Sequence, residues 1–161
     1  MGTSLALIGP GAIGSTIAAF LHDAGYPVLV CGHTPRESIE VRPDDREPIV
    51  LPGPVLTNPA DVAGPVDVVL LAVKDTQNAA AADWLARLCD ERTVVCVLQN
   101  GVEQVERVGR YCPGAEVLPA AVWFSAQTQP QGWVRLRTGV RLVLPTGDSS
   151  ERLAELLRDA G

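Results

Sequence analysis

Short apolar runs alternate with amphipathic stretches in the first part of the chain. Leu5–Ile8 is continuously apolar, which is typical of a buried strand. The apolar positions that follow share one helical face, and Gly25 stands where such a helix would end. These positions are Ile13, Ile17, Phe20, Leu21 and Ala24. Residues 27–31 form a second apolar run, so we predict that the chain opens with a right-handed β-α-β unit.

Residues 36–65 interrupt this alternation. The segment lacks a helical period and holds six prolines. Two short β-prone pieces, residues 39–42 and 48–51, flank a polar turn. This pattern predicts an excursion of short strands, or a hairpin, in place of a full helix.

The alternation resumes at residues 66–73, an apolar run typical of a strand in a parallel sheet. A helix over 75–89, a strand over 93–98 and a helix from Val102 to about Arg110 are predicted next. From Glu116 onward the pattern favours successive strands and then a helix that starts at Asp148. The expected strands are 117–125, 132–137 and 140–144. We therefore predict an α/β fold, a Rossmann-like, doubly wound and mostly parallel sheet extended by a C-terminal strand meander, in one domain over residues 1–161.

Composition narrows the classes of function. The chain has 161 residues and a formal net charge of -6, which argues against nucleic acid as a partner. The four cysteines form no C-x-x-C pair and are expected to be buried free thiols in a reducing compartment. No apolar stretch is long enough to span a membrane, and the first residues do not resemble a signal peptide. A cytoplasmic protein without membrane contact is expected.

The first strand runs directly into glycines with the G-x-G-x-x-G spacing. Gly9, Gly11 and Gly14 lie between this strand and the first helix, which is the context that a dinucleotide-binding turn requires. Gly9 would permit the tight turn, Gly11 the approach of a pyrophosphate, and Gly14 the packing of helix on strand. The alternative is a glycine-rich turn that binds no ligand. We expect a dinucleotide site.

The residues after the second strand bear on the choice of cofactor. NAD-specific sites usually carry an acid here, whereas this chain continues through His33, Thr34 and Arg36 and has no acid before Glu37. A carboxylate would repel a 2′-phosphate, so the sequence favours NADP over NAD. The alternative is a surface loop with one arginine. Lys74, the only lysine, follows a predicted strand directly and is expected to face the ligand cleft.

Several motifs in a fixed order resemble the 2-dehydropantoate 2-reductase, or ketopantoate reductase, family. They are Gly-Pro-Gly-Ala-Ile-Gly at 9–14, Val73-Lys74 with Gln77 three residues later, Leu98-Gln99-Asn100-Gly101, and the strands around Gln131-Gly132-Trp133. The family reduces a 2-keto acid, 2-dehydropantoate, to its 2-hydroxy acid, pantoate, with NADPH, on the route to pantothenate and coenzyme A.

The resemblance implies a role for each matching position. Lys74 would face the adenosine ribose and its 2′-phosphate, and Gln77 would lie near the adenine. Asn100, followed by Gly101, would lie by the nicotinamide ribose and the substrate. The family often has an arginine directly after the second strand, so Arg36 or a protonated His33 would take its place, beside Thr34. The residues expected at the pyrophosphate are Gly9, Pro10, Gly11, Ala12, Ile13 and Gly14.

The resemblance covers only the amino-terminal half of that enzyme. The general-acid lysine of the family lies in a following helical domain, so residues 1–161 alone are expected to bind NADPH without useful turnover. The expected partners are the 2-keto acid, the helical domain and a second copy of the chain in a homodimer. A stand-alone NADP-binding or sensing module is the alternative. No metal site is expected, because no ligand cluster with metal spacing is present.

Overall fold

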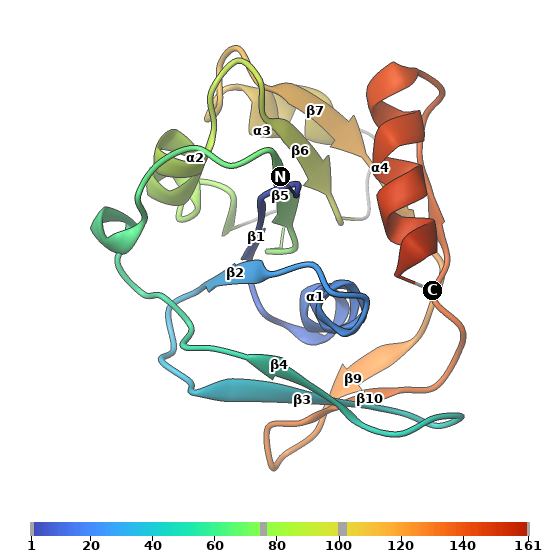
Figure 1. The fold of residues 1–161 in the computed structure, drawn as a ribbon. Helices are drawn as coiled ribbons and strands as arrows, with labels where there is room; N and C mark the ends of the chain where they lie inside the picture. The colour runs from blue at the N-terminus through green and yellow to red at the C-terminus, as the bar shows by residue number, and fades with distance from the viewer. Residues whose placement is uncertain (1, 75–76, 100–102, 161) are drawn as a thin grey trace.

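The computed structural model describes residues 2–74, 77–99 and 103–160. Its centre is a five-stranded parallel sheet in the order β2-β1-β5-β6-β7 (Figure 1). The strands are β1 (Leu5–Ile8), β2 (Val28–Cys31), β5 (Val68–Leu71), β6 (Val94–Val97) and β7 (Glu116–Pro119). Every residue of β1 and β5 is buried, because helices cover both faces of the sheet.

Helices pack on both faces of this sheet, so the predicted doubly wound architecture is confirmed. Leu5 and Leu7 contact one core together with α1 and α4, whereas Ala6 and Ile8 face a second core with α2 and α3. The helices are α1 (Ala12–Asp23), α2 (Ala82–Leu88), α3 (Gln104–Gly109), α4 (Asp148–Asp159) and a short 3-10 helix (Pro59–Asp61). Among the described helices, none is long and apolar enough to cross a membrane.

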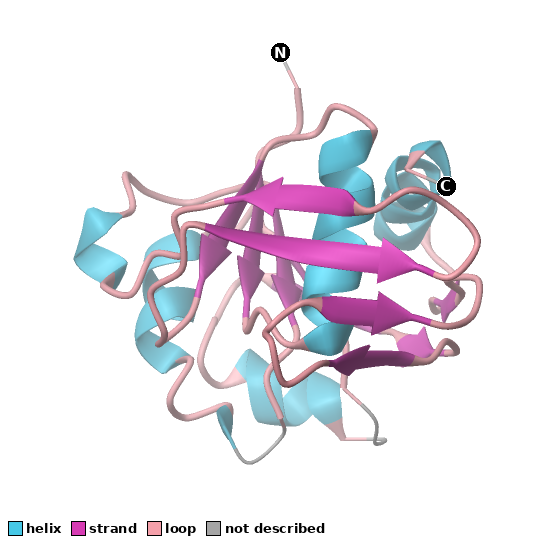
Figure 2. Cartoon of the chain, turned by 90° about the horizontal axis from the view of Figure 1, so that it is seen from below, coloured by secondary structure: helices cyan, strands magenta, loops and turns pink. Residues whose placement is uncertain are grey.

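A second sheet of four strands covers the outer side of α1. Its order is β4-β3-β10-β9, and in Figure 2 its strands run across the axis of α1. The strands are β3 (Ser38–Pro43), β4 (Ile49–Pro52), β9 (Ala126–Thr128) and β10 (Val134–Leu136). β3 and β4 form the antiparallel hairpin that the proline-rich segment predicted. Their buried side chains join those of β10 and α1 in one core.

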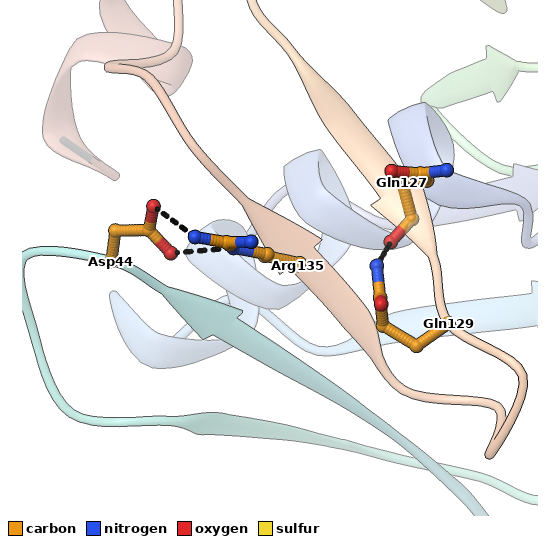
Figure 3. Close-up of polar contacts among 4 residues, drawn as sticks. All are labelled: Asp44, Gln127, Gln129 and Arg135. Carbon is orange, nitrogen blue, oxygen red and sulfur yellow. Dashed lines mark hydrogen bonds and ion pairs between the residues drawn. The ribbon is translucent and has the colours of Figure 1, made fainter.

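An ion pair ties the β3–β4 connection to β10. Arg135 donates from Nε and Nη2 to the two carboxylate oxygens of Asp44 over 3.0 and 3.1 Å (Figure 3). The backbone N–H of Asp44 also donates to the carbonyl of Leu136 over 2.9 Å. In the same view, Nε2 of Gln129 donates to the backbone carbonyl of Gln127. The guanidinium of Arg135 lowers the pKa of the Asp44 carboxyl group.

The expectation that a meander extends the main sheet is wrong for all but its first strand. β7 completes the parallel sheet, but β10 pairs with β3 and β9, while β8 (Ala121–Val122) pairs only with β11 (Leu142–Val143). The reason lies in the side chains of β10. Val134 and Leu136 are buried and Arg135 between them is not, which suits a sheet with one solvated face rather than a strand buried on both sides.

The predicted second helix is longer than the observed one. The described part of residues 75–89 forms turns up to Ala81, and α2 begins only at Ala82. Before α2, the Gln77 side chain accepts from the Lys74 N–H and the Asn78 side chain accepts from Gln99. Trp84, Leu85 and Leu88 face inward as predicted.

Candidate functional site

The strands β1, β2, β5 and β6 end at the same edge of the parallel sheet, and the residues that follow them enclose a cavity of about 690 Å³. Ligands of open α/β folds bind at this edge. The lining combines backbone, apolar and cationic groups. It consists of Gly9, Pro10, Gly11, Ala12, Ile13, His33, Thr34, Arg36, Ala72, Val73, Lys74, Gln77, Leu98 and Gln99.

Two glycines of the motif are required by lack of space. Gly9 has a φ of 91°, and a Cβ there would lie 2.8 Å from Cγ1 of Val73. A Cβ on Gly14 would lie 2.7 Å from both the Gly9 carbonyl oxygen and Cδ1 of Leu7. Gly14 therefore belongs to the helix–strand packing rather than to the cavity lining. These contacts agree with the tight turn and close packing expected from the spacing.

Gly11 differs from the other two glycines. None of the described atoms comes within 4 Å of a Cβ built on Gly11, so packing does not require a glycine there. Its N–H donates to the Gly9 carbonyl over 2.8 Å, which closes the turn. Within the described part of the chain, no side chain caps α1, and its first turn holds no acid. The N–H groups at the start of α1 thus remain available to an anion in the cavity.

Arg36 is held by a loop that is remote in sequence. Its Nη2 donates over 2.8 Å to the carbonyl of Gly132, in the turn between β9 and β10. Gly132 has a φ of 98°, and a Cβ on it would lie 3.0 Å from that nitrogen. The half-buried guanidinium is therefore positioned on the cavity wall, next to the exposed residues His33 and Thr34.

Lys74 opens a closed turn on the opposite wall. Its backbone N–H donates to Oε1 of Gln77 over 3.2 Å, and the Gln77 N–H donates to the Lys74 carbonyl over 2.7 Å. The Gln77 side-chain oxygen thus supports the turn, while the residue still lines the cavity. Among the described lining residues, the charged side chains are Lys74 and Arg36, and none is a carboxylate.

Gln99 is a lining residue to which the sequence assigned no role. It is 7% exposed and donates from Nε2 to the Val73 carbonyl and to Oδ1 of Asn78. A polar residue at the end of an apolar strand was the available signal. Asn100 and Gly101, which follow it, lie outside the described residues. The contact of Gly132 with Arg36 gave no sequence signal, because 96 positions separate them.

A second cavity, of about 280 Å³, adjoins the first. The two share five lining residues: Gly9, Pro10, His33, Val73 and Gln77. The second extends toward α2, where Trp84 and Ala81 line it. A Cβ on Gly32 would lie 2.8 Å from Cδ of Pro10 between these walls.

The chemistry of the lining suits binding rather than covalent catalysis. Cys31, at the end of β2, is fully buried, and burial raises its pKa from 9.0 to about 12, so it is no nucleophile at neutral pH. The prediction of buried free thiols holds for Cys31, Cys96 and Cys112, while Cys89 is half-buried. Across the described ranges, no group of three or more His, Cys, Asp or Glu side chains could hold a metal ion.

Fold and site together define a Rossmann-type α/β domain with a cationic cavity at the glycine-rich turn. The sequence model of the ketopantoate reductase PanE/ApbA family matches residues 5–149, and the chain belongs to this family. This match confirms the expected resemblance. The family is one of NAD(P)H-dependent reductases.

Named relatives and solved structures agree with this family assignment. The chain is 66% identical to the 2-dehydropantoate 2-reductase of Mycobacterium tuberculosis over all 161 residues, which are 55% of that protein. It superposes on the dimeric ketopantoate reductase from Staphylococcus aureus with a TM-score of 0.81 and 28% identity, covering 97% of this chain and 52% of that one. The chain spans about half the length of the curated relatives it matches.

D-mandelate dehydrogenase, solved with NADH and anilino(oxo)acetate, shares the fold with a TM-score of 0.81 at 21% identity, over 98% of this chain and 54% of that one. A neighbour with this fold thus binds NADH. The fold does not decide between the two nicotinamide cofactors, and the choice must come from side chains in the cavity.

Proposed function

We propose that residues 1–161 form the NADPH-binding domain of an enzyme that reduces 2-dehydropantoate to pantoate. The observation that carries this proposal is the lining of the larger cavity, which presents Lys74 and Arg36 and, among its described residues, no carboxylate; the one acid of the adjoining cavity, Asp83, lies in the first turn of α2. A carboxylate here would select the unphosphorylated ribose of NAD, whereas two cations favour a 2′-phosphate.

The shape of the site supports one orientation of the cofactor. The start of α1, at Ala12 and Ile13, would hold the pyrophosphate. The adenosine would lie where the two cavities meet, with Gln77 beside the adenine. His33 and Thr34 would flank its ribose, within reach of Lys74 and Arg36. The nicotinamide would lie toward Leu98 and Gln99, and Asn100 and Gly101, beyond them, would contact its ribose and the substrate.

Reduction of a 2-keto acid requires a hydride on the carbonyl carbon and a proton on its oxygen. A bound NADPH would supply the hydride. Lys74 is engaged with the phosphate end in this proposal, and the chain holds no second lysine. We therefore assign the proton donor and the partner of the substrate carboxylate to the helical domain of the longer relatives. The domain bounds 1–161 and the homodimer remain predictions.

The test uses two nucleotide fragments that differ by the 2′-phosphate alone. Adenosine 2′,5′-bisphosphate and 5′-AMP are compared for the rise in melting temperature that each gives to the chain. Binding to the folded state raises stability in proportion to the logarithm of ligand concentration over Kd. The bisphosphate should give the larger rise at equal concentration. Equal rises would overturn the assignment of Lys74 and Arg36 to a 2′-phosphate.

A further inference from the structure

A buried pair of amide side chains lies beneath the cavity, between the ends of β5 and β6. Gln99 follows β6 and is 7% exposed, and Asn78 precedes α2 and is 5% exposed. Taking an amide out of water without a partner costs free energy, so buried amides are kept only where they bond. The Rossmann topology itself does not require a polar pair at this place.

Gln99 joins two points of the segment that carries Lys74. Its Nε2 donates over 2.8 Å to the carbonyl of Val73, the residue before Lys74. The same nitrogen donates over 2.7 Å to Oδ1 of Asn78, the residue after Gln77. An amide nitrogen carries two hydrogens, and these two acceptors use both. Val73 and Asn78 are thus both bonded to the residue two positions beyond the end of β6.

The segment between these anchors is itself closed by the two hydrogen bonds between Lys74 and Gln77. Lys74 is therefore preceded by a residue bonded to Gln99 and is itself bonded to Gln77. The side chain of Lys74 is exposed. The position of its backbone therefore limits which part of the cavity its ammonium group can contact. Preorganisation of this kind lowers the ordering cost of binding.

We propose that Gln99 is a positioning residue that sets the preference for NADPH by holding Lys74 in place through Val73 and Asn78. The inference rests on the proposed function, in which Lys74 binds the 2′-phosphate. Gln99 also lines the cavity on the side proposed for the nicotinamide, so its loss acts on both cofactors there, whereas the part that acts through Lys74 falls on NADPH alone. Loss of the Gln99 amide should therefore weaken NADPH binding more than NADH binding.

The test measures the ratio of NADH to NADPH dissociation constants in variants of the chain. Gln99→Met keeps the length of the side chain and removes both hydrogen bonds. It should lower the ratio about tenfold, since each lost bond of this kind is worth roughly a factor of 2–10. In Lys74→Ala the ratio should fall further. The double variant Gln99→Met/Lys74→Ala should have the same ratio as Lys74→Ala, because both substitutions act on the same contact, the one between Lys74 and the 2′-phosphate.

Thr93→Val is the matched control. Thr93 is 1% exposed at the other end of the same two strands, and its hydroxyl donates to the Val66 carbonyl over 2.8 Å. This variant should lower the melting temperature without changing the ratio. Asn78→Ala removes one of the two acceptors and should lower the ratio about threefold, which provides a second measurement if Gln99→Met does not fold.

The outcomes separate the two proposals. If Lys74→Ala lowers the ratio and neither Gln99→Met nor Asn78→Ala does, the positioning role is wrong and the proposed function stands. An equal loss of affinity for both cofactors in Gln99→Met would place Gln99 on the shared part of the ligand and also overturn the inference. An unchanged ratio in Lys74→Ala would overturn both proposals.

Discussion

At the scale of single residues, the three glycines of the turn have different reasons to be glycine. Gly9 and Gly14 lie against backbone and core atoms, whereas the space at Gly11 is open. The conformation of Gly11, with a φ of -81°, is accessible to any residue. The glycine spacing therefore serves folding at two positions, and in the proposed function it serves ligand access at the third.

This difference predicts opposite effects of two alanine substitutions. Gly14→Ala places a Cβ 2.7 Å from the Gly9 carbonyl oxygen and should destabilise the fold by about 1–3 kcal/mol. Gly11→Ala should leave the melting temperature without ligand within a degree or two and weaken NADPH by about tenfold or more, because the methyl group occupies the approach of the pyrophosphate. Thermal unfolding and a cofactor titration of both variants check this. Normal NADPH binding by Gly11→Ala would place the pyrophosphate elsewhere.

Residue types in the loops could be predicted, but their partners could not. The spacing of the glycines, the missing acid after β2 and the position of Lys74 all follow from local sequence. The bond from Arg36 to Gly132 and the bonds from Gln99 to Val73 and Asn78 depend on tertiary contacts. Such contacts leave no periodic pattern, because each joins segments that pack only after folding.

At the scale of elements, the β9–β10 turn connects the second sheet to the cavity. Gly132→Ala adds a Cβ 3.0 Å from Nη2 of Arg36 at a φ of 98°, which a side chain adopts only with strain. The carbonyl at this position then holds Arg36 less well. NADPH affinity should fall several-fold and NADH affinity should change little, as measured by parallel titrations.

Gly139→Ala is the control for that substitution. Gly139 lies in another connection of the same part of the chain, and none of the described atoms comes within 4 Å of a Cβ there. The variant should bind both cofactors as the unchanged chain does. If Gly132→Ala behaves in the same way, Arg36 is not held for the phosphate.

The elements themselves differ in how far the sequence predicts them. Four strands of the parallel sheet were predicted because each is an unbroken apolar run, as in β1 and β5, whereas β7 begins with the exposed Glu116. The pairing of β10 with β3 was not predicted, because β3 lies about ninety residues earlier in the chain. The alternation of apolar and polar side chains in β10 indicates a strand with one solvent-exposed face, but it does not indicate which sheet the strand joins.

At the scale of the whole molecule, two buried thiols make stability depend on alkaline pH. Burial raises the pKa of Cys31 and of Cys96 from 9.0 to about 12. The thiols ionise in the unfolded chain near pH 9 and in the folded chain only near pH 12. The contribution of these two buried thiols to the free energy of unfolding is thus fully present below pH 9 and is lost as the pH rises toward 12.

The free energy of unfolding should therefore fall above pH 9 by about 1.4 kcal/mol per thiol for each pH unit. Urea unfolding at a series of pH values measures this slope. The double variant Cys31→Ala/Cys96→Ala should start less stable, because it loses buried side-chain volume, and should show a shallower slope. An identical slope in the variant would mean that other groups cause the alkaline loss.

The carboxyl ends of β1, β2, β5 and β6 meet at one cavity, and the central claim is that this cavity selects NADPH. The most direct measurement is calorimetric titration of the chain with NADPH and with NADH, at low and at high salt. Two charge-assisted hydrogen bonds contribute about 1.5–3 kcal/mol each, less where solvent screens them. NADPH should therefore bind about 10²-fold more tightly at low salt, and the difference should narrow at high salt. Equal dissociation constants for the two cofactors at low salt would contradict the account.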